Sequence, residues 1–192
     1  MTSTVGRIER IDQRTGNLAS LDVMLADSDR VASASNFWRP DPNAGSHSGA
    51  LFNWSAISAF WPERSVLCAT WSDLSYAMMQ LDDDHVLLRS RKVGARAVYV
   101  SFLEVAPQIR VGSWERRFIG LGAAMLTFAV VRSRQLGFEG RIGLHSVLQA
   151  RGFYTNLGFH ELDDPGLNEY WESYLELSPD AADRFMAKSS GA

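Results

Sequence analysis

The sequence has a single cysteine and little net charge among its 192 residues. One cysteine cannot form a disulfide within the chain, and Cys68 stands in the apolar run 66–69, where a small buried thiol is expected. Hydrophobic residues make up 46% and charged residues 21% of the chain, which excludes a disordered chain, a collagen-like repeat and a disulfide scaffold. We therefore expect one compact domain over 1–192.

No stretch is apolar for long enough to span a bilayer. The longest charge-free stretch, 42–62, is rich in Asn, Ser, Gly and His, and the most apolar stretch, 118–131, is too short. Residues 1–14 mix charges of both signs with single apolar residues, unlike a signal peptide. The net charge of −3 argues against nucleic acid as a partner. These features predict a cytoplasmic protein without a membrane segment.

Apolar periodicity and turn residues predict the order of the elements. Strands are expected at Val5, Ile8 and Ile11 and over 65–71, 74–81, 97–105, 140–147, 159–162 and 170–177. Helices are expected over 18–34 with Asn17 as cap, 51–61, 120–136, 149–157 and 180–186. Irregular segments are expected at the loop 39–49, the solvated turn 82–84, the turn 163–166 and the frayed tail 187–192. The order predicts a mixed α/β fold, with a central sheet of about six to seven strands and helices on both faces.

The most informative motif lies where the helix over 120–136 begins. It reads Arg117, Phe118, Ile119, Gly120, Leu121, Gly122, Ala123. The two glycines allow a tight turn and a close approach to a ligand, while the first helical turn presents N–H groups without helical partners. That arrangement suits a phosphate or diphosphate, with Arg117 adding positive charge. Close helix packing is the alternative reason for the glycines.

The motif resembles the acetyl-CoA diphosphate motif Arg-x-x-Gly-x-Gly of the GNAT family of N-acetyltransferases. Segment 102–107 resembles the strand of that family that lends backbone groups to the pantetheine arm. Segment 150–159 resembles its second signature, a helix ending in Tyr-x-x-x-Gly-Phe, and 140–146 and 174–179 resemble a bacterial subgroup of unknown substrate. The specific part of the resemblance covers 97–177, and the element order also resembles the GNAT fold.

The resemblance implies an acyltransferase that moves an acetyl group from acetyl-CoA to a primary amine by direct attack in a ternary complex, without a metal. It implies cofactor contacts from Leu103, Val105, the seven motif residues 117–123 and Tyr154. The acceptor is a small-molecule or peptide amine that the sequence does not identify. A non-catalytic module that binds CoA or a protein partner is the alternative, because a fold does not determine a function. The Trp-rich first helices and the last strands are a candidate homodimer surface.

Three side chains are candidates for the chemistry. An amine with a pKa of about 10.4 must lose its proton before attack at pH 7, which costs about 4.6 kcal/mol. Glu104 or His145 could accept this proton, although Glu104 could be a solvated or hydrogen-bonded strand residue and His145 a core histidine. The Val105 amide is the candidate donor to the thioester oxygen. Tyr154, which the family places near the sulfur, is the candidate acid or hydrogen-bond donor, and with Phe153 it could instead pack the helix.

Two departures from the family pattern are present. The loop 108–116 is longer than is common there and would lie beside the cofactor entrance. Val147 stands where the family often has Asn, so one side-chain contact to the cofactor is expected to be missing.

Other polar and aromatic groups leave alternatives open. The basic residues Arg89, Arg91, Lys92 and Arg96 form a solvated loop or contact the 3′-phosphate of CoA or a nucleic acid. Trp38, Trp54 and Trp61 belong to the core or wall an acceptor site. The four histidines show no paired ligand spacing, and no metal is proposed.

Overall fold

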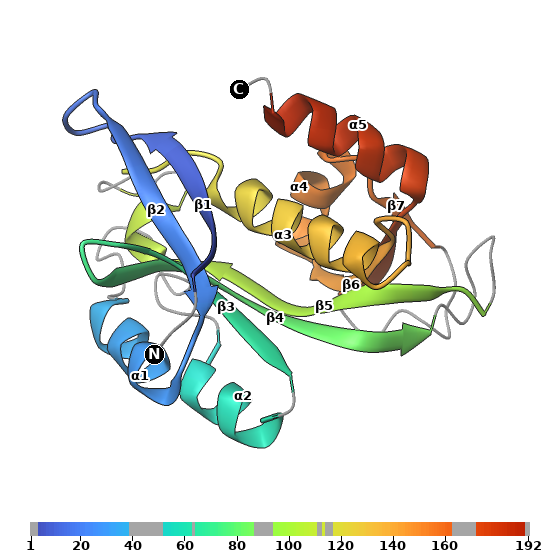
Figure 1. The fold of residues 1–192 in the computed structure, drawn as a ribbon, viewed down its shortest axis with the longest axis horizontal. Coiled ribbons are helices and arrows are strands. Elements are labelled where there is room, and N and C mark those ends of the chain that lie inside the picture. Colours follow the sequence, from blue (N-terminus) through green and yellow to red (C-terminus); the bar gives the residue numbers. More distant parts are fainter. Residues whose placement is uncertain are drawn as a thin grey trace. The chain divides into compact units, whose positions relative to one another are not determined.

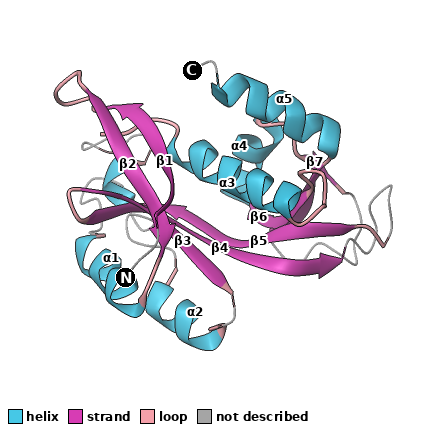
Figure 2. Ribbon diagram, in the orientation of Figure 1, coloured by secondary structure: helices cyan, strands magenta, loops and turns pink. Residues whose placement is uncertain are grey.

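The computed structural model describes residues 4–38, 52–62, 64–86, 94–110, 113, 117–162 and 172–190. The strands of this part are β1 (Thr4–Ile11), β2 (Leu18–Leu25), β3 (Ser65–Trp71), β4 (Leu74–Val86), β5 (Arg96–Val105), β6 (Ile142–Val147), β7 (His160–Glu161) and β8 (Glu172–Leu177). The helices are α1 (Ser28–Phe37), α2 (Trp54–Phe60), α3 (Leu121–Gln135), α4 (Arg151–Asn156) and α5 (Pro179–Ser190), with short 3-10 turns η2 (Pro107–Ile109) and η3 (Leu148–Ala150). Figure 2 shows these helices and strands by colour.

The strands form one mixed sheet in the order β1-β2-β3-β4-β5-β6-β8-β7 (Figure 1). Strands β5 and β6 are parallel, and α3 provides the crossover between them. Antiparallel pairing joins β1 to β2, β2 to β3, β6 to β8 and β7 to β8. The predicted mixed α/β class is confirmed, and the eight strands exceed the expected number by at least one.

The chain forms two compact units, 1–80 with 102–125 and 81–101 with 126–192. Strands β4 and β5 and helix α3 contribute residues to both units. The expectation of one domain over 1–192 stays a prediction.

In the first unit, β1 and β2 form a hairpin where the sequence predicted a helix from residue 18. Ala19, Leu21 and Val23 are buried while Leu18 and Ser20 are exposed, which is the two-residue alternation of a strand. The helix prediction was wrong here because leucines spaced by three and four residues also fit a helical face. Pairing with β1 and β3 on its two edges makes this segment a strand.

Helix α1 begins at Ser28 and not near residue 18. Its cap is Asp27, whose side chain accepts a hydrogen bond from the Arg30 amide at 2.9 Å, so the predicted Asn17 cap was wrong. Helix α2 lies within the predicted helix 51–61, beside α1. Figure 1 shows α1 and α2 on one side of β3 and β4 and the start of α3 on the other.

The hairpin between β3 and β4 turns at the predicted position. Ser72 and Asp73 have φ values of 48° and 63°, the left-handed conformation that two-residue hairpins require. Cys68 in β3 is fully buried, and burial raises the pKa of its thiol to about 11. The prediction of a buried thiol is therefore confirmed.

In the second unit, β4 continues through residues 82–84, so the predicted solvated turn was wrong. The side chain of Asp83 accepts from Nε and Nη2 of Arg132 in α3 at 3.0 and 2.6 Å, and Asp84 pairs with Arg96. Partners outside β4 therefore compensate the run of acidic residues and allow the strand to extend.

The core of the second unit lies on one face of β5, β6 and β8. Its strand residues are all at most 3% exposed: Val98, Val100, Ile142, Leu144, Leu175 and Leu177. Helix α5 adds Ala181, Ala182 and Phe185 to this core, and its Asp183 accepts from Arg134 of α3 at 2.5 Å. The helix extends to Ser190, so the predicted frayed tail was wrong for 187–190.

The remaining predictions have mixed outcomes. Strands β5, β6 and β8 and helix α3 lie within about two residues of their predicted bounds, and the predicted helix 149–157 is the turn η3 followed by α4. The loop 39–49, the turn 163–166, and Arg89, Arg91 and Lys92 lie outside the described residues. Within the described part of the chain, no helix is long and apolar enough to cross a membrane.

Candidate functional site

A loop of four residues, 117–120, leads into α3 in the first unit. Gly120 has a φ of +73° and its carbonyl accepts from the Ala124 amide at 3.0 Å, so the helix begins with Leu121, Gly122 and Ala123. Among the residues that the structure describes, the amides of these three donate a hydrogen bond to no protein acceptor. Free amides at the start of a helix can bind an anion.

The loop combines anchored and exposed residues. Phe118 and Leu121 are each 2% exposed, whereas Ile119 is 45% exposed and Gly120 is also exposed. The Phe118 ring packs edge to face on Trp71 and Tyr76, with centroids 5.9 and 5.1 Å away. Phe118 and Leu121 therefore anchor the loop on either side of Gly120, which is exposed.

Arg117, the first residue of the loop, is held by contacts within the protein. Its Nε and Nη2 atoms donate to Oδ2 of Asp12 at 3.0 and 2.7 Å, and its guanidinium lies 4.1 Å from the centroid of a Trp71 ring. The hydrogen bond lowers the pKa of Asp12 and raises the pKa of Arg117. The pair therefore stays ionised at neutral pH, with its charges balanced locally.

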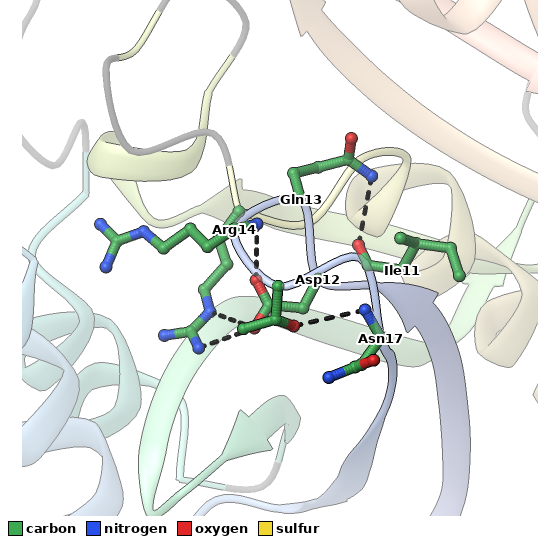
Figure 3. Close-up of polar contacts among 7 residues, drawn as sticks. Ile11, Asp12, Gln13, Arg14 and Asn17 are labelled. Carbon is green, nitrogen blue, oxygen red and sulfur yellow. Dashed lines mark hydrogen bonds and ion pairs between the residues drawn. The ribbon is translucent and has the colours of Figure 1, made fainter.

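Asp12 lies in the turn between β1 and β2 (Figure 3). Its Oδ1 atom accepts from the Arg14 amide at 3.0 Å, and its own amide donates to the carbonyl of Asn17 at 2.9 Å. The neighbouring Gln13 amide donates to the Arg117 carbonyl at 2.9 Å. The turn thus contacts the entrance of α3 through a side chain and through the backbone.

Arg10 in β1 is a second arginine near the glycine loop. A Cβ built on Gly120 would lie 3.8 Å from the Nε atom of Arg10. The Nη1 atom of Arg10 donates to the Glu9 carbonyl at 2.6 Å, and burial lowers the pKa of the guanidinium. No described carboxylate pairs with Arg10.

The sequence prediction missed both Arg10 and Asp12. Neither belongs to a motif, and each lies more than a hundred residues from the loop it approaches. Asp12 is only 3% exposed, and a buried carboxylate requires a partner, but this burial is visible only in the folded chain and no signal in the sequence indicates it.

The end of β5 carries the predicted residues Leu103, Glu104 and Val105. The Glu104 side chain is 2% exposed, accepts from Nε1 of Trp54 at 3.0 Å and pairs with Nη2 of Arg110. Nε of Arg110 also donates to the Val105 carbonyl at 3.3 Å. Glu104 is thus a buried carboxylate with charged and neutral donors around it, an arrangement that suits a structural role.

The predicted tryptophans divide between core and surface. Trp38 and Trp54 are 5% and 1% exposed, and their rings pack at a centroid distance of 6.3 Å. Trp61 is half-buried and stacks on Phe102 of β5 at 5.9 Å. Core packing therefore accounts for Trp38 and Trp54, while Trp61 is partly exposed beside β5.

Tyr154 of α4 belongs to the second unit. It is 8% exposed, and its ring packs on Phe153 and Phe159 at centroid distances of 5.0 and 5.5 Å. Burial raises the pKa of Tyr154 to about 12. The hydroxyl therefore remains protonated across the neutral range and can donate a hydrogen bond.

His145 of β6 also belongs to the second unit. Its Nδ1 atom lies 2.6 Å from the Tyr99 hydroxyl, and its ring lies 5.0 Å from that of Tyr174, its register partner in β8. Burial raises the pKa of Tyr174. His145 is therefore hydrogen-bonded to a side chain. The alternative prediction, a core histidine, had its hydrogen bond with a backbone group.

The predicted residues are divided between the two units. Residues 103–105 and 117–123 share the first unit, and His145 and Tyr154 share the second. Across the described ranges, no group of three or more His, Cys, Asp or Glu side chains is arranged to hold a metal ion.

A parallel strand pair joined by a helix, with a glycine loop at the helix entrance, is an α/β arrangement. The particular fold is that of the GNAT acetyltransferases. The GNAT domain of S. lividans PAT superposes with a TM-score of 0.54 at 14% identity, covering 88% of this chain and 95% of that domain. The resemblance inferred from the sequence is confirmed for the fold.

Two further solved structures share this fold. A mutant of the AtaT toxin, bound to acetyl-CoA and to the C-terminus of the antitoxin AtaR, has a TM-score of 0.59 at 14% identity, covering 87% of this chain and 98% of that one. A putative arylalkylamine N-acetyltransferase of the yellow fever mosquito has a TM-score of 0.56 at 19% identity, covering 92% and 95%. No family model matches the sequence. No curated protein matches it either.

Proposed function

We propose that the protein is an N-acetyltransferase that moves an acetyl group from acetyl-CoA to a primary amine by direct attack. The observation that carries this proposal is the start of α3, where three amides have no acceptor among the described residues and follow a glycine in the left-handed conformation. The GNAT fold supports it, and the related AtaT structure contains acetyl-CoA.

The groups around the loop fit the diphosphate of acetyl-CoA. The amides of Leu121, Gly122 and Ala123 offer directional donors with partial positive charge, and Arg10 offers a full charge beside Gly120. Backbone groups of Leu103 and Val105 would bind the pantetheine arm. Together these groups match the two parts of acetyl-CoA, a doubly charged diphosphate and a pantetheine arm that contains amides.

Each chemical step requires one group of the protein. The Val105 amide donates to the thioester oxygen, where negative charge develops. His145 or Glu104, directly or through water, accepts the proton of the amine. The ion pair of Glu104 with Arg110 favours His145 for this role.

Tyr154 acts as a hydrogen-bond donor to the departing sulfur. Its pKa of about 12 exceeds that of a thiol, about 8.5, by roughly 3.5 units, so complete proton transfer would cost about 5 kcal/mol. A hydrogen bond from the hydroxyl stabilises the developing thiolate without that cost.

A non-catalytic module that binds CoA or a protein is the second candidate, and the AtaT complex with its antitoxin illustrates this fold in contact with a protein segment. A small-molecule or peptide amine as acceptor, a homodimer and a cytoplasmic location remain predictions.

The test combines binding with turnover. The affinity for acetyl-CoA is measured by calorimetry, and thiol release is then followed with a panel of small-molecule and peptide amines for the parent and Tyr154→Phe. Turnover with any amine supports the enzyme. Binding without turnover on the whole panel favours the module. Absence of binding contradicts the enzyme and a CoA-binding module, and leaves only a module that binds a protein.

A further inference from the structure

We propose that Arg117 is a positioning residue, which Asp12 holds in place so that the loop entering α3 keeps its shape, and that it is not a ligand of the diphosphate. This inference rests on the proposed function. It assigns to the turn between β1 and β2 the task of setting the geometry of the anion site.

The first line of evidence is that the guanidinium of Arg117 already has partners within the protein. Two of its nitrogen atoms point at one oxygen of Asp12, and its plane lies over Trp71. The side chains of Arg117 and Asp12 are 19% and 4% exposed. A phosphate that approached Arg117 would therefore meet a charge already balanced by a carboxylate.

The second line of evidence is the fixed backbone on both sides. The Arg117 carbonyl accepts from Gln13, and the next residue, Phe118, is buried against Trp71 and Tyr76. Gly120 follows two residues later. A shift at Arg117 therefore changes the direction of the amides that follow, and binding geometry tolerates little misplacement.

The third line of evidence is the rigidity of the turn that carries Asp12. The Asp12 carbonyl accepts from the amides of Thr15 and Gly16 at 3.2 and 2.8 Å, and Gly16 has a φ of +71°. The other carboxylate oxygen accepts from the Arg14 amide (Figure 3). Asp12 is thus a fixed point to which Arg117 is attached.

The two roles of Arg117 predict opposite effects of Asp12→Asn. If Arg117 were a phosphate ligand that Asp12 restrains, removal of the carboxylate charge would free the guanidinium and tighten CoA binding. If Arg117 positions the loop, the same change loosens the loop, and the affinity for CoA falls about tenfold or more.

A second variant separates the roles in another way. Lysine binds phosphate well as a point charge but lacks the planar fork that pairs with Asp12 and stacks on Trp71. Arg117→Lys therefore weakens CoA binding about as much as Asp12→Asn if Arg117 positions the loop. It leaves the affinity nearly unchanged if Arg117 is a ligand.

The experiment measures dissociation constants for CoA and for pantetheine, which lacks the diphosphate, by calorimetry and ligand-observed NMR on the full chain. The control is Asp22→Asn, which breaks an exposed pair with Arg7 in the same hairpin. We expect weaker CoA binding and unchanged pantetheine binding in both test variants, and no change in the control. Thermal unfolding verifies that each variant is folded.

Each outcome bears on one claim. Tighter or unchanged CoA binding by Asp12→Asn, or retained affinity in Arg117→Lys, overturns the positioning role while the proposed function stands. Equal loss of affinity for CoA and for pantetheine also overturns the positioning role, because the loss would then not depend on the diphosphate that the loop is proposed to bind. A parent protein that does not bind CoA refutes the proposed function itself.

Discussion

Two arginines approach the loop before α3, and their partners give them different tasks. Arg117 pairs with Asp12, whereas no described carboxylate pairs with Arg10, whose Nε atom lies near Gly120. Asp12 therefore balances the charge of the motif residue Arg117, and Arg10, which belongs to no motif, is the arginine proposed to meet the diphosphate. The chemistry of the site follows from these contacts and not from residue type.

Arg10→Gln tests whether the charge of Arg10 contributes to CoA binding. We expect the affinity for CoA to fall about tenfold at low salt, because a charged hydrogen bond contributes about 1.5 kcal/mol or more, and the loss to shrink at high salt. Calorimetry at two ionic strengths measures it. Arg7→Gln, on an exposed arginine of the same strand, is the control, and an equal loss there would show that only general charge matters.

Tyr154→Phe tests the hydrogen bond to sulfur. We expect kcat to fall about tenfold to a hundredfold with little change in the KM for acetyl-CoA. Because burial raises the pKa of Tyr154 to about 12, the hydroxyl stays protonated, and the parent rate should not fall through its ionisation below about pH 11. Phe153→Leu removes the neighbouring ring and serves as control. A kcat unchanged in Tyr154→Phe would assign the residue to packing alone.

At the scale of elements, a tight turn and a helix start create the donor array. Gly120 needs its positive φ to end the loop and begin α3, and Phe118 fixes the loop in the core. The β1–β2 hairpin supplies Asp12 from its turn and Arg10 from β1. Two segments, the β1–β2 hairpin and the loop with the start of α3, therefore meet within the first unit, although 105 residues separate Asp12 from Arg117.

Substitutions at Gly120 separate backbone strain from charge. Gly120→Ala should lower the free energy of unfolding by about 1 to 2 kcal/mol, since a left-handed φ disfavours a side chain, and should keep part of the CoA affinity. Gly120→Glu adds a carboxylate where the diphosphate is proposed to bind, and this variant should not bind CoA. Urea unfolding and calorimetry measure both effects.

Gly137→Ala is the matched control for that comparison. Gly137 has a φ of +78° and nothing within 4 Å of an added Cβ, and it follows the other end of α3, so it carries a similar strain away from the loop. If Gly120→Glu retained the affinity of Gly120→Ala, the anion site would have to lie elsewhere.

At the scale of the whole molecule, ligand binding and pH should both change stability. Acetyl-CoA at about 100 times its dissociation constant should stabilise the folded state by about 2.7 kcal/mol. For a chain of this length that corresponds to a rise in Tm of roughly 5 to 10 °C. Differential scanning calorimetry measures the shift, which should be lost in Gly120→Glu.

Acid should remove the contribution of Asp12. Its pKa is lowered in the folded state, so the stability that its charge provides is complete above the ordinary carboxyl pKa of about 3.9 and is lost as pH falls through the lower folded value. The difference in unfolding free energy between the parent and Asp12→Asn should be constant from pH 8 to pH 5 and shrink below pH 4. A difference that did not vary with pH would exclude this ion pair as its source.

Several elements could be predicted because local signals determine them. Ser72 and Asp73 predicted the β3–β4 turn, and apolar residues closed by Gly137 predicted α3. The segment from Leu18 to Leu25 was misassigned because its leucines fit two periods, and only pairing with β1 and β3 decides between them. The second signature and the glycine loop were found because each is contiguous.

The sequence by itself determined the fold class, the glycine loop and the buried thiol, since each depends on neighbours along the chain. Tertiary structure alone decided that Arg117 meets Asp12, 105 residues away, and that Arg10 comes to Gly120. The pairing of distant charges depends on which strands lie side by side, and no local pattern encodes that choice. For the same reason, only the folded chain assigns Glu104 to a hydrogen bond with Trp54, 50 residues away, and His145 to a hydrogen bond with Tyr99.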